Sequence, residues 1–274
     1  MLARLAGLCL ALLAPVAAHA QPLKVMSFNV RLPVASDGAN AWEKRRDLFV
    51  ETIAKADPDI IGTQELWKVQ GDYVVQRLPR YRWFGIDRRG GHADEHMGVF
   101  YRSDRLRLIE QGDFWLSDTP QVPASISWGN LYPRIVTWGL FETRKGRRFY
   151  LLNTHFPYRE QDEAARERCA RLLLARIAAL PADIPVVLTG DFNTGPDTPP
   201  HALLAGALAD VWTSAARHAG PEATFHGFTG KPDRRIDWIM TRGIAAVSVR
   251  TIDAHRGPLY PSDHFPVLAR LRLR

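Results

Sequence analysis

The chain has 274 residues, 46% of them hydrophobic, and carries a formal net charge of +7 at pH 7 with a pI of about 9.7. This composition supplies a large apolar core, and the lack of low-complexity segments and of regular repeats excludes a disordered chain and a solenoid. The positive charge is compatible with an anionic substrate, but it is also common among exported proteins that bind nothing acidic.

The first 20 residues have the pattern of a secretory signal. Residues 1–4 carry a positive charge, residues 5–14 form an apolar run too short to span a bilayer, and Ala-His-Ala at 18–20 matches a signal peptidase site. We therefore expect cleavage after Ala20, export to the periplasm or beyond, and a single monomeric domain over 21–274. The alternative is an uncleaved membrane anchor, and no later apolar run is long enough to cross a membrane.

The first third of the chain alternates strand and helix patterns. β-Forming residues predict strands over residues 24–30 and 60–62. Apolar residues at helical spacing predict helices over residues 41–56 and 69–78. The Lys-Arg-Arg run at 44–46 is expected to lie on the solvent side of the first helix.

The remainder of the chain is richer in strands. We expect one hairpin to join residues 97–102 to 106–110 and a second to join 134–142 to 148–153. The strongest helical pattern covers residues 160–180. The last elements are predicted as helices over 201–208 and 212–219 and strands over 186–188, 235–240, 246–252 and 267–273.

Strands outnumber helices, and the helices fall between pairs of strands. This order predicts an α+β fold, a layered α/β-sandwich in which two packed mixed β-sheets are flanked by helices, and argues against a regular ladder of parallel strands and helices. Cys169 is the only cysteine beyond the signal segment, so an internal disulfide is excluded and a buried structural thiol is expected.

Asparagine, carboxylate and histidine residues recur where predicted strands end or begin. Because strand ends converge on one rim of a layered fold, we expect these side chains to gather there. Oxygen-rich groups of this kind suit a hard divalent cation such as Mg²⁺. The residues are Asn29, Glu65, Asp191, Asn193, Asp237, Asp263 and His264.

Each short motif has an alternative interpretation. Glu65 is the first candidate metal ligand, or a solvated turn residue. Asp191 and Asn193 alternate across Phe192 and so point the same way, which suits joint handling of one water molecule, yet the segment also fits an ordinary turn rich in Asp and Asn.

Ser262-Asp263-His264 carries the sharpest motif. His264 is predicted to meet charge on a phosphate oxygen if Asp237 holds its ring. The same residue types also make good surface turns. His155, at the end of an apolar strand, is a second candidate phosphate contact, although a single strand-end histidine is more often structural.

The joint order of these motifs resembles the endonuclease/exonuclease/phosphatase superfamily, which has the DNase I-like fold. The resemblance spans essentially the whole chain after the signal. It implies a four-layered α/β-sandwich and hydrolysis of phosphate esters that depends on Mg²⁺ or Mn²⁺. The motifs are Met26-Ser27-Phe28-Asn29-Val30, Gln64-Glu65, Gly98-Val99-Phe100-Tyr101-Arg102, Asn153-Thr154-His155-Phe156, Gly190-Asp191-Phe192-Asn193, Arg235-Ile236-Asp237-Trp238-Ile239 and Ser262-Asp263-His264.

The resemblance assigns metal-side roles to three residues. Glu65 matches the principal metal ligand of the family. Asn29 matches a residue that assists the metal and the phosphate, and Asp263 an acid near the metal.

The resemblance also assigns catalytic roles. Asp191 matches the residue that activates the attacking water, and Asn193 matches its partner on the phosphate. His264 matches the catalytic histidine and Asp237 its orienting acid. His155 matches a second histidine found in some branches.

Substrate contacts are less sharply marked. Arg134 could reach a phosphate or cap a strand, and Glu95 and His96 could touch substrate or lie in a solvated loop. The sequence slightly favours a phosphodiesterase acting on nucleic acid or nucleotides. A hydrolase of lipid headgroups or sugar phosphates is the alternative, and a non-catalytic binding module on the same fold is a third possibility.

Overall fold

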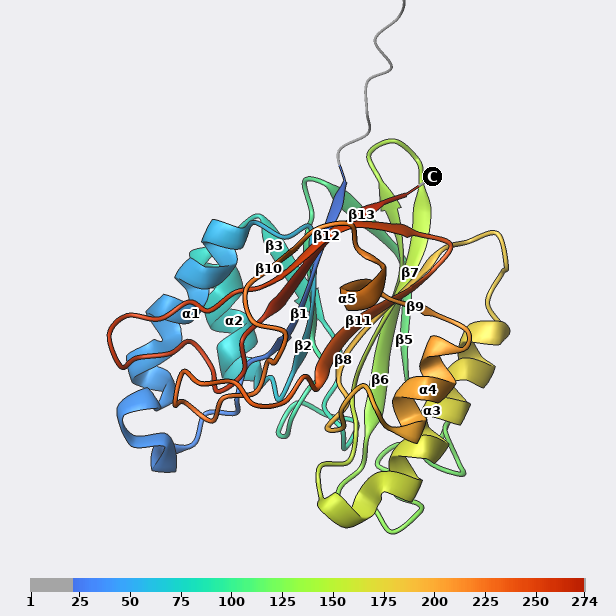
Figure 1. Ribbon diagram of the computed structural model, residues 1–274, viewed down its shortest axis with the longest axis horizontal. Helices are drawn as coiled ribbons and strands as arrows, with labels where there is room; N and C mark the ends of the chain where they lie inside the picture. Colours follow the sequence, from blue (N-terminus) through green and yellow to red (C-terminus); the bar gives the residue numbers. More distant parts are fainter. Residues whose placement is uncertain (1–21, 274) are drawn as a thin grey trace, which may run out of the picture.

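The computed structural model describes residues 22–273, so the predicted signal segment lies outside the described residues. Two β-sheets pack face to face, and helices cover both outer faces (Figure 1). The elements are β1 (Leu23–Asn29), η1 (Ala35–Asn40), α1 (Trp42–Ala56), β2 (Ile60–Gln64), α2 (Lys68–Arg77), β3 (Tyr81–Phe84), β4 (Val99–Arg102), β5 (Leu106–Trp115), β6 (Ile135–Thr143), β7 (Arg148–His155), η2 (Glu160–Asp162), α3 (Glu163–Ala178), β8 (Val186–Asp191), α4 (Pro199–Ala205), β9 (Ala209–Asp210), α5 (Val211–Ser214), β10 (His218–Ala219), β11 (Asp237–Arg242), β12 (Ala245–Thr251) and β13 (Val267–Arg272).

Three apolar layers hold the sandwich together. The central layer lies between the sheets, where Val25 and Ile60 share one core with Leu151 and Val187. Helices α1 and α2 bury a second layer against the seven-stranded sheet, and α3 and α4 bury a third against the six-stranded sheet (Figure 1). Cys169 lies in this third layer as a buried free thiol. The predicted sandwich of two mixed sheets flanked by helices is therefore confirmed.

The sheet topology places four strand ends at one rim. The seven strands have the order β10-β12-β13-β1-β2-β4-β3, and the six have the order β5-β6-β7-β8-β11-β9. Strands β1 and β2 are parallel, as are β7 and β8, so their carboxyl ends bring Asn29, Glu65, His155 and Asp191 to the same edge. Strand β11 is antiparallel to β8, which places Asp237 directly opposite Asp191. Among residues 22–273, no helix is both long and apolar enough to cross a bilayer.

The predicted hairpin over residues 97–110 is wrong. Strand β4 pairs with β2 and β3, whereas β5 pairs with β6 in the other sheet. Ser103 and Asp104 do make a turn, but this turn carries the chain from one sheet to the other. Turn-forming residues specify a change of direction and leave the pairing partner to tertiary packing.

Two smaller predictions also fail. The helix expected over 212–219 covers only Val211–Ser214, and His218–Ala219 instead pairs with β12. Strand β3, at the edge of its sheet, was not predicted because its four residues, Tyr81–Phe84, are too few to show a period.

Arg45 does not face solvent as predicted for the basic run at 44–46. Its side chain is fully buried, and it donates hydrogen bonds of 2.6–2.9 Å to the carbonyl oxygens of Asn40, Val30, Arg31 and Pro261. These carbonyls lie directly after β1, at the end of η1 and in the loop before β13. Arg45 therefore ties together two loops that reach the rim described above.

Candidate active site

A cavity of about 340 Å³ opens at the rim where the strand ends converge. Asn29 and Asp237 lie at its edge and hydrogen bond to residues that line it. Most of the predicted site residues therefore come together in space. The predicted residues on the cavity wall are Glu65, Glu95, Arg134, His155, Asp191, Asn193, Asp263 and His264.

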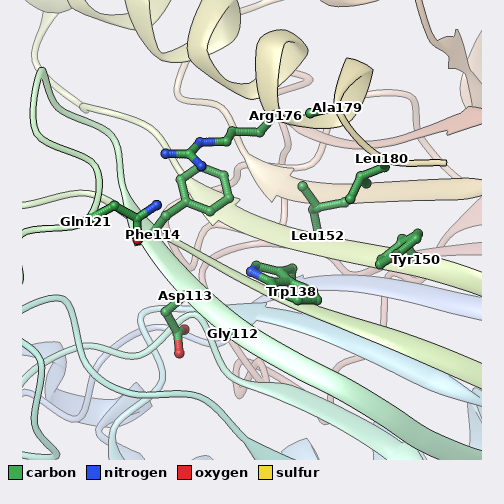
Figure 2. A pocket seen from close by; sticks show the side chains of 10 residues that line it. All are labelled: Gly112, Asp113, Phe114, Gln121, Trp138, Tyr150, Leu152, Arg176, Ala179 and Leu180. Atoms are coloured by element: carbon green, nitrogen blue, oxygen red, sulfur yellow. The ribbon is translucent and has the colours of Figure 1, made fainter.

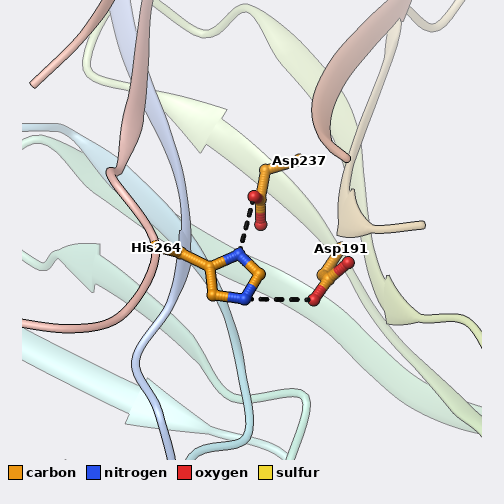
Figure 3. A group of neighbouring side chains, drawn as sticks. All are labelled: Asp191, Asp237 and His264. Atoms are coloured by element: carbon orange, nitrogen blue, oxygen red, sulfur yellow. Dashed lines mark hydrogen bonds and ion pairs between the residues drawn. The ribbon is translucent and has the colours of Figure 1, made fainter. Parts of the chain in front are cut away.

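Figure 3 shows how His264 lies between two carboxylates. Its Nδ1 lies 2.8 Å from Oδ2 of Asp237, and its Nε2 lies 3.8 Å from Oδ2 of Asp191. Burial alone would lower the pKa of His264, but the negative charges of Asp237 and Asp191 raise it to about 10. The ring is therefore positively charged near neutral pH and directs an N–H toward the cavity.

Asp191 is held by two donors. Its Oδ1 accepts from the backbone N–H of Asn193 at 2.9 Å, and its Oδ2 accepts from Nδ2 of Asn29 at 2.9 Å. Burial and the nearby carboxylate of Asp237 raise the pKa of Asp191 to about 6. A carboxylate with this pKa can accept a proton from an attacking water near neutral pH.

A buried aromatic residue, Phe192, anchors the turn after β8. Phe192 is fully buried and stacks on Trp238, with ring centroids 4.4 Å apart. The side chains of Asp191 and Asn193 both reach the cavity on either side of this anchor, and Nδ2 of Asn193 donates to the carbonyl of Phe156 at 3.0 Å. The expected common direction of Asp191 and Asn193 is thus present in the structure.

Glu65 and Asp263 concentrate negative charge on one side of the cavity. Glu65 has a left-handed backbone (φ 59°), and its carboxylate accepts from Asn29 Nδ2 at 3.0 Å and from the backbone N–H of Leu32 at 3.1 Å. Burial and the charge of Asp263 raise the pKa of Glu65. Arg31, whose Nε lies 3.9 Å from Oδ2 of Asp263, offsets part of this charge. Clustered carboxylate oxygens fit a hard divalent cation.

Asp191, Asp237 and His264 also lie close enough together to hold a metal ion, with one ligand atom from each within 4.8 Å of the others. Glu65 and Asp263, on the wall of the same cavity, are the other candidate ligands. The amide oxygen of Asn29 accepts from the backbone N–H of Arg31 at 3.0 Å, and its nitrogen donates to the carboxylates of Glu65 and Asp191. In this arrangement Asn29 orients acidic groups.

Arg134 and His155 form the opposite wall of the cavity. Arg134 is 5% exposed, and no residue in the range 22–273 provides a hydrogen-bond acceptor for its Nη1. His155 Nε2 lies 3.5 Å from Oδ2 of Asp191, while burial and the charge of Arg134 lower the pKa of His155 well below its usual value. Arg134 is therefore a buried cation next to a neutral imidazole.

The two other predicted substrate contacts differ in position. Glu95 lines the cavity, and burial together with nearby Glu65 raises its pKa to about 7. His96 is fully buried and is not part of the cavity wall: its Nδ1 lies 3.0 Å from the carbonyl oxygen of Leu66 and its Nε2 lies 2.9 Å from Nδ1 of His92. The prediction that His96 contacts substrate is therefore wrong. Its ring instead bonds within the protein, to Leu66 and His92.

Sequence patterns missed several lining residues. Among these residues of the cavity wall are Arg31, Arg88, Tyr132, Phe225 and Arg234. A usable signal existed for Arg31, which lies two positions after Asn29. Arg88 and Tyr132 come from loops without regular secondary structure, so no periodicity could have placed them.

Comparison with known proteins identifies relatives that share this fold and sequence. The family model of the Endonuclease/Exonuclease/phosphatase family matches residues 26–264. A family member of known structure from Bacteroides vulgatus is 30% identical and has a TM-score of 0.88, covering 93% of this chain and all of its own. A mannosyl-6-phosphatase from Bacteroides thetaiotaomicron is 31% identical with a TM-score of 0.84, covering 91% of this chain and 99% of its own.

Curated relatives are more distant. An uncharacterized protein of Acanthamoeba polyphaga mimivirus is 32% identical over 56% of this chain, and the match spans 59% of that protein. The matches to other curated relatives span between 33% and 65% of their length. The matching family model, the shared two-sheet fold and the similarity over more than nine-tenths of the chain agree with one another. The chain belongs to the endonuclease/exonuclease/phosphatase family.

Proposed function

We propose that the protein hydrolyses a phosphate ester with the help of a divalent cation, Mg²⁺ or Mn²⁺. The observation that carries this proposal is Arg134, a buried guanidinium inside the cavity whose Nη1 lacks an acceptor among residues 22–273. A buried cation of this kind is costly unless an anion completes it, and the planar guanidinium matches phosphate oxygens. Burial lowers the pKa of Arg134 and the charges of Glu95, Asp191 and Glu65 oppose this effect, but no residue among 22–273 accepts a hydrogen bond from this Nη1, which leaves the donor for a ligand oxygen.

The residues around Arg134 supply the remaining steps. Asp191 accepts a proton from the attacking water, and Asn193 helps to fix the phosphate. The charged ring of His264, held by Asp237, donates a hydrogen bond to an oxygen on which charge develops. Attack by water in this way needs no covalent intermediate on the protein.

Glu65, which Asn29 orients, and Asp263 are the residues that would hold the cation. When bound, a divalent cation would offset the charge on the phosphate and on the leaving oxygen. The feature that supports this assignment is that the carboxylate of Glu65, with a pKa raised by burial, lies on the same cavity wall as Asp263.

The distribution of basic residues supports a small substrate over a nucleic-acid backbone. Arg45 is buried within the protein, and Arg235 is paired with Asp210 at 2.8 Å. The run at 144–148 lies in the β6–β7 turn, at the opposite end of β7 from His155. The arginine residues on the cavity wall are Arg31, Arg88, Arg134 and Arg234, and the runs at 44–46 and 144–148 do not extend them into a longer track. A relative of similar length, 31% identical, is a mannosyl-6-phosphatase, which also supports a small substrate.

Arg134→Met should raise KM for phosphate esters at least about tenfold, because a charged hydrogen bond to phosphate contributes about 1.5–3 kcal/mol. Initial rates on p-nitrophenyl phosphate, bis-p-nitrophenyl phosphate, plasmid DNA, RNA and sphingomyelin would be compared for both proteins. Arg46→Met, at an exposed position, is the matched control and should behave like wild type. Turnover of DNA or RNA at a rate far above that of the small esters would overturn the proposed substrate class.

Export through residues 1–20 is part of the same proposal.

A further inference from the structure

The loop over residues 85–96 is unusually well fixed for a segment without regular secondary structure. The carboxylate of Asp87 accepts hydrogen bonds of 2.6–3.0 Å from the backbone N–H groups of Arg89, Gly91, Ala93 and Asp94. One buried side chain thus organises most of the loop. Fixed loops of this kind are suited to recognition, because little conformational entropy is lost when a ligand binds.

His96 connects this loop to the catalytic side of the cavity. Its backbone exchanges hydrogen bonds with Leu66, at 2.7 and 3.2 Å, and its ring bonds to the same residue. Leu66 directly follows Glu65. The loop is therefore held at a constant distance from the acidic side of the site, which explains why His96 is buried and not exposed to substrate.

The loop presents two side chains to the cavity, Arg88 and Glu95. Nη1 of Arg88 lies 3.0 Å from Oε1 of Glu95, and the guanidinium of Arg88 lies 4.5 Å from the ring centroid of Tyr132. Each of the two charged residues is only 8% exposed. All three line the same cavity as Asp191 and His264, and none has a role in the proposed hydrolysis.

A carboxylate is a poor neighbour for a phosphate, because the two negative charges repel. Glu95 is therefore suited to the part of the substrate that carries no charge. A carboxylate can accept hydrogen bonds from hydroxyl groups, while the guanidinium beside it donates to the same hydroxyl oxygens. The Arg88–Glu95 pair has the donor and acceptor pattern that a vicinal diol would complete.

We propose that Arg88 and Glu95 bind the hydroxyl groups of a polyol, so that the preferred substrates are phosphate esters of sugars. This inference rests on the proposed function, since it concerns the group attached to the phosphate. The ring of Tyr132 and the carboxylates of Glu95 and Asp94 hold the Arg88 guanidinium in place. The buried position of the pair makes the recognition selective, because an analogue without hydroxyls leaves the remaining hydrogen-bonding capacity of both residues unfilled while excluding water.

The test compares substrates of the same ring size with and without hydroxyl groups. Glucose 6-phosphate and mannose 6-phosphate would be assayed beside cyclohexyl phosphate. Glu95→Met and Arg88→Met should each lower kcat/KM on the sugar phosphates at least about 30-fold, mainly through KM, and change it less than about threefold on cyclohexyl phosphate. Glu95→Gln keeps an acceptor for Arg88, so its kcat/KM on the sugar phosphates should lie between the values of wild type and Glu95→Met. Glu43→Gln, at an exposed acid on α1, is the control and should behave like wild type.

A ribose also carries a vicinal diol. Measuring kcat/KM on AMP and on 2′,3′-dideoxy-AMP therefore distinguishes a preference for nucleotides from a preference for hexose phosphates. Equal losses on substrates with and without hydroxyls would overturn the inference and assign Glu95 to the reaction itself. Equal wild-type rates on sugar phosphates and cyclohexyl phosphate would also overturn it while leaving the proposed function intact.

Calorimetry separates the two proposals if wild type hydrolyses none of these esters. In EDTA, wild type should bind glucose 6-phosphate or mannose 6-phosphate more tightly than Glu95→Met does, at least about 30-fold. Binding that is the same for both proteins would overturn the inference. Absence of turnover together with this difference in binding would overturn only the proposed function.

Discussion

Replacing His264 by alanine should lower kcat on a phosphate ester at least about 100-fold, the usual scale for removing a group that stabilises charge in the transition state. The ring is fixed by Asp237 at 2.8 Å and points its second nitrogen into the cavity. Asp191→Asn should cause a loss of similar size, since an amide cannot accept the proton of the attacking water. Steady-state kinetics with saturating Mg²⁺ would measure both.

His201 provides a matched control for His264. It is also buried and also paired with an aspartate, with its Nε2 2.9 Å from Oδ2 of Asp210, but it lies outside the cavity. His201→Ala should lower thermal stability and leave kcat of the folded protein within about threefold of wild type. If both histidine variants lost the same activity, the loss would be a packing effect, and His264 would have no direct part in the reaction.

Asp237→Asn should shift the alkaline limb of the pH–activity profile to lower pH. In the folded protein, the negative charges of Asp237 and Asp191 raise the pKa of His264 to about 10 against the effect of burial. Replacing the carboxylate of Asp237 removes part of this effect, so the ring loses its proton at a lower pH. Because the proposed mechanism uses the charged ring, kcat/KM should begin to fall at a lower pH in the variant than in wild type.

Profiles of kcat/KM between pH 5 and 10.5 would measure this shift. Asp210→Asn, which alters the similar pair with His201 outside the cavity, should keep the wild-type limb. An unchanged limb in Asp237→Asn would mean that activity does not depend on the proton of His264.

Much of the site could be predicted from the sequence because the ends of neighbouring strands converge on one rim of the fold. Asn29, Glu65 and Asp191 follow apolar strands, and the parallel pairs β1–β2 and β7–β8 bring their ends together. Phe192 could be assigned to the core because it alternates with two polar neighbours. Local sequence patterns were sufficient to predict the position of a residue when that position depended only on its own strand.

Residues whose place depends on distant partners could not be predicted. Arg45 looks like a solvated charge, but its four carbonyl partners come from three separate segments. His96 looks like a substrate contact, but pairing with Leu66 across 30 positions buries it. The false hairpin at Ser103 has the same cause, since the two sheets compete for the strands on either side of a turn.

Metal dependence of phosphate-ester turnover tests the central claim most directly. Wild-type protein would be treated with EDTA, dialysed, and assayed for release of p-nitrophenol from p-nitrophenyl phosphate while Mg²⁺ or Mn²⁺ is titrated back, with Glu65→Gln measured in parallel. We predict a rate at background after EDTA, full recovery with the added cation, and at least about tenfold more cation for half-maximal rate in Glu65→Gln. Full turnover in EDTA, or a Glu65→Gln titration identical to wild type, would contradict the account.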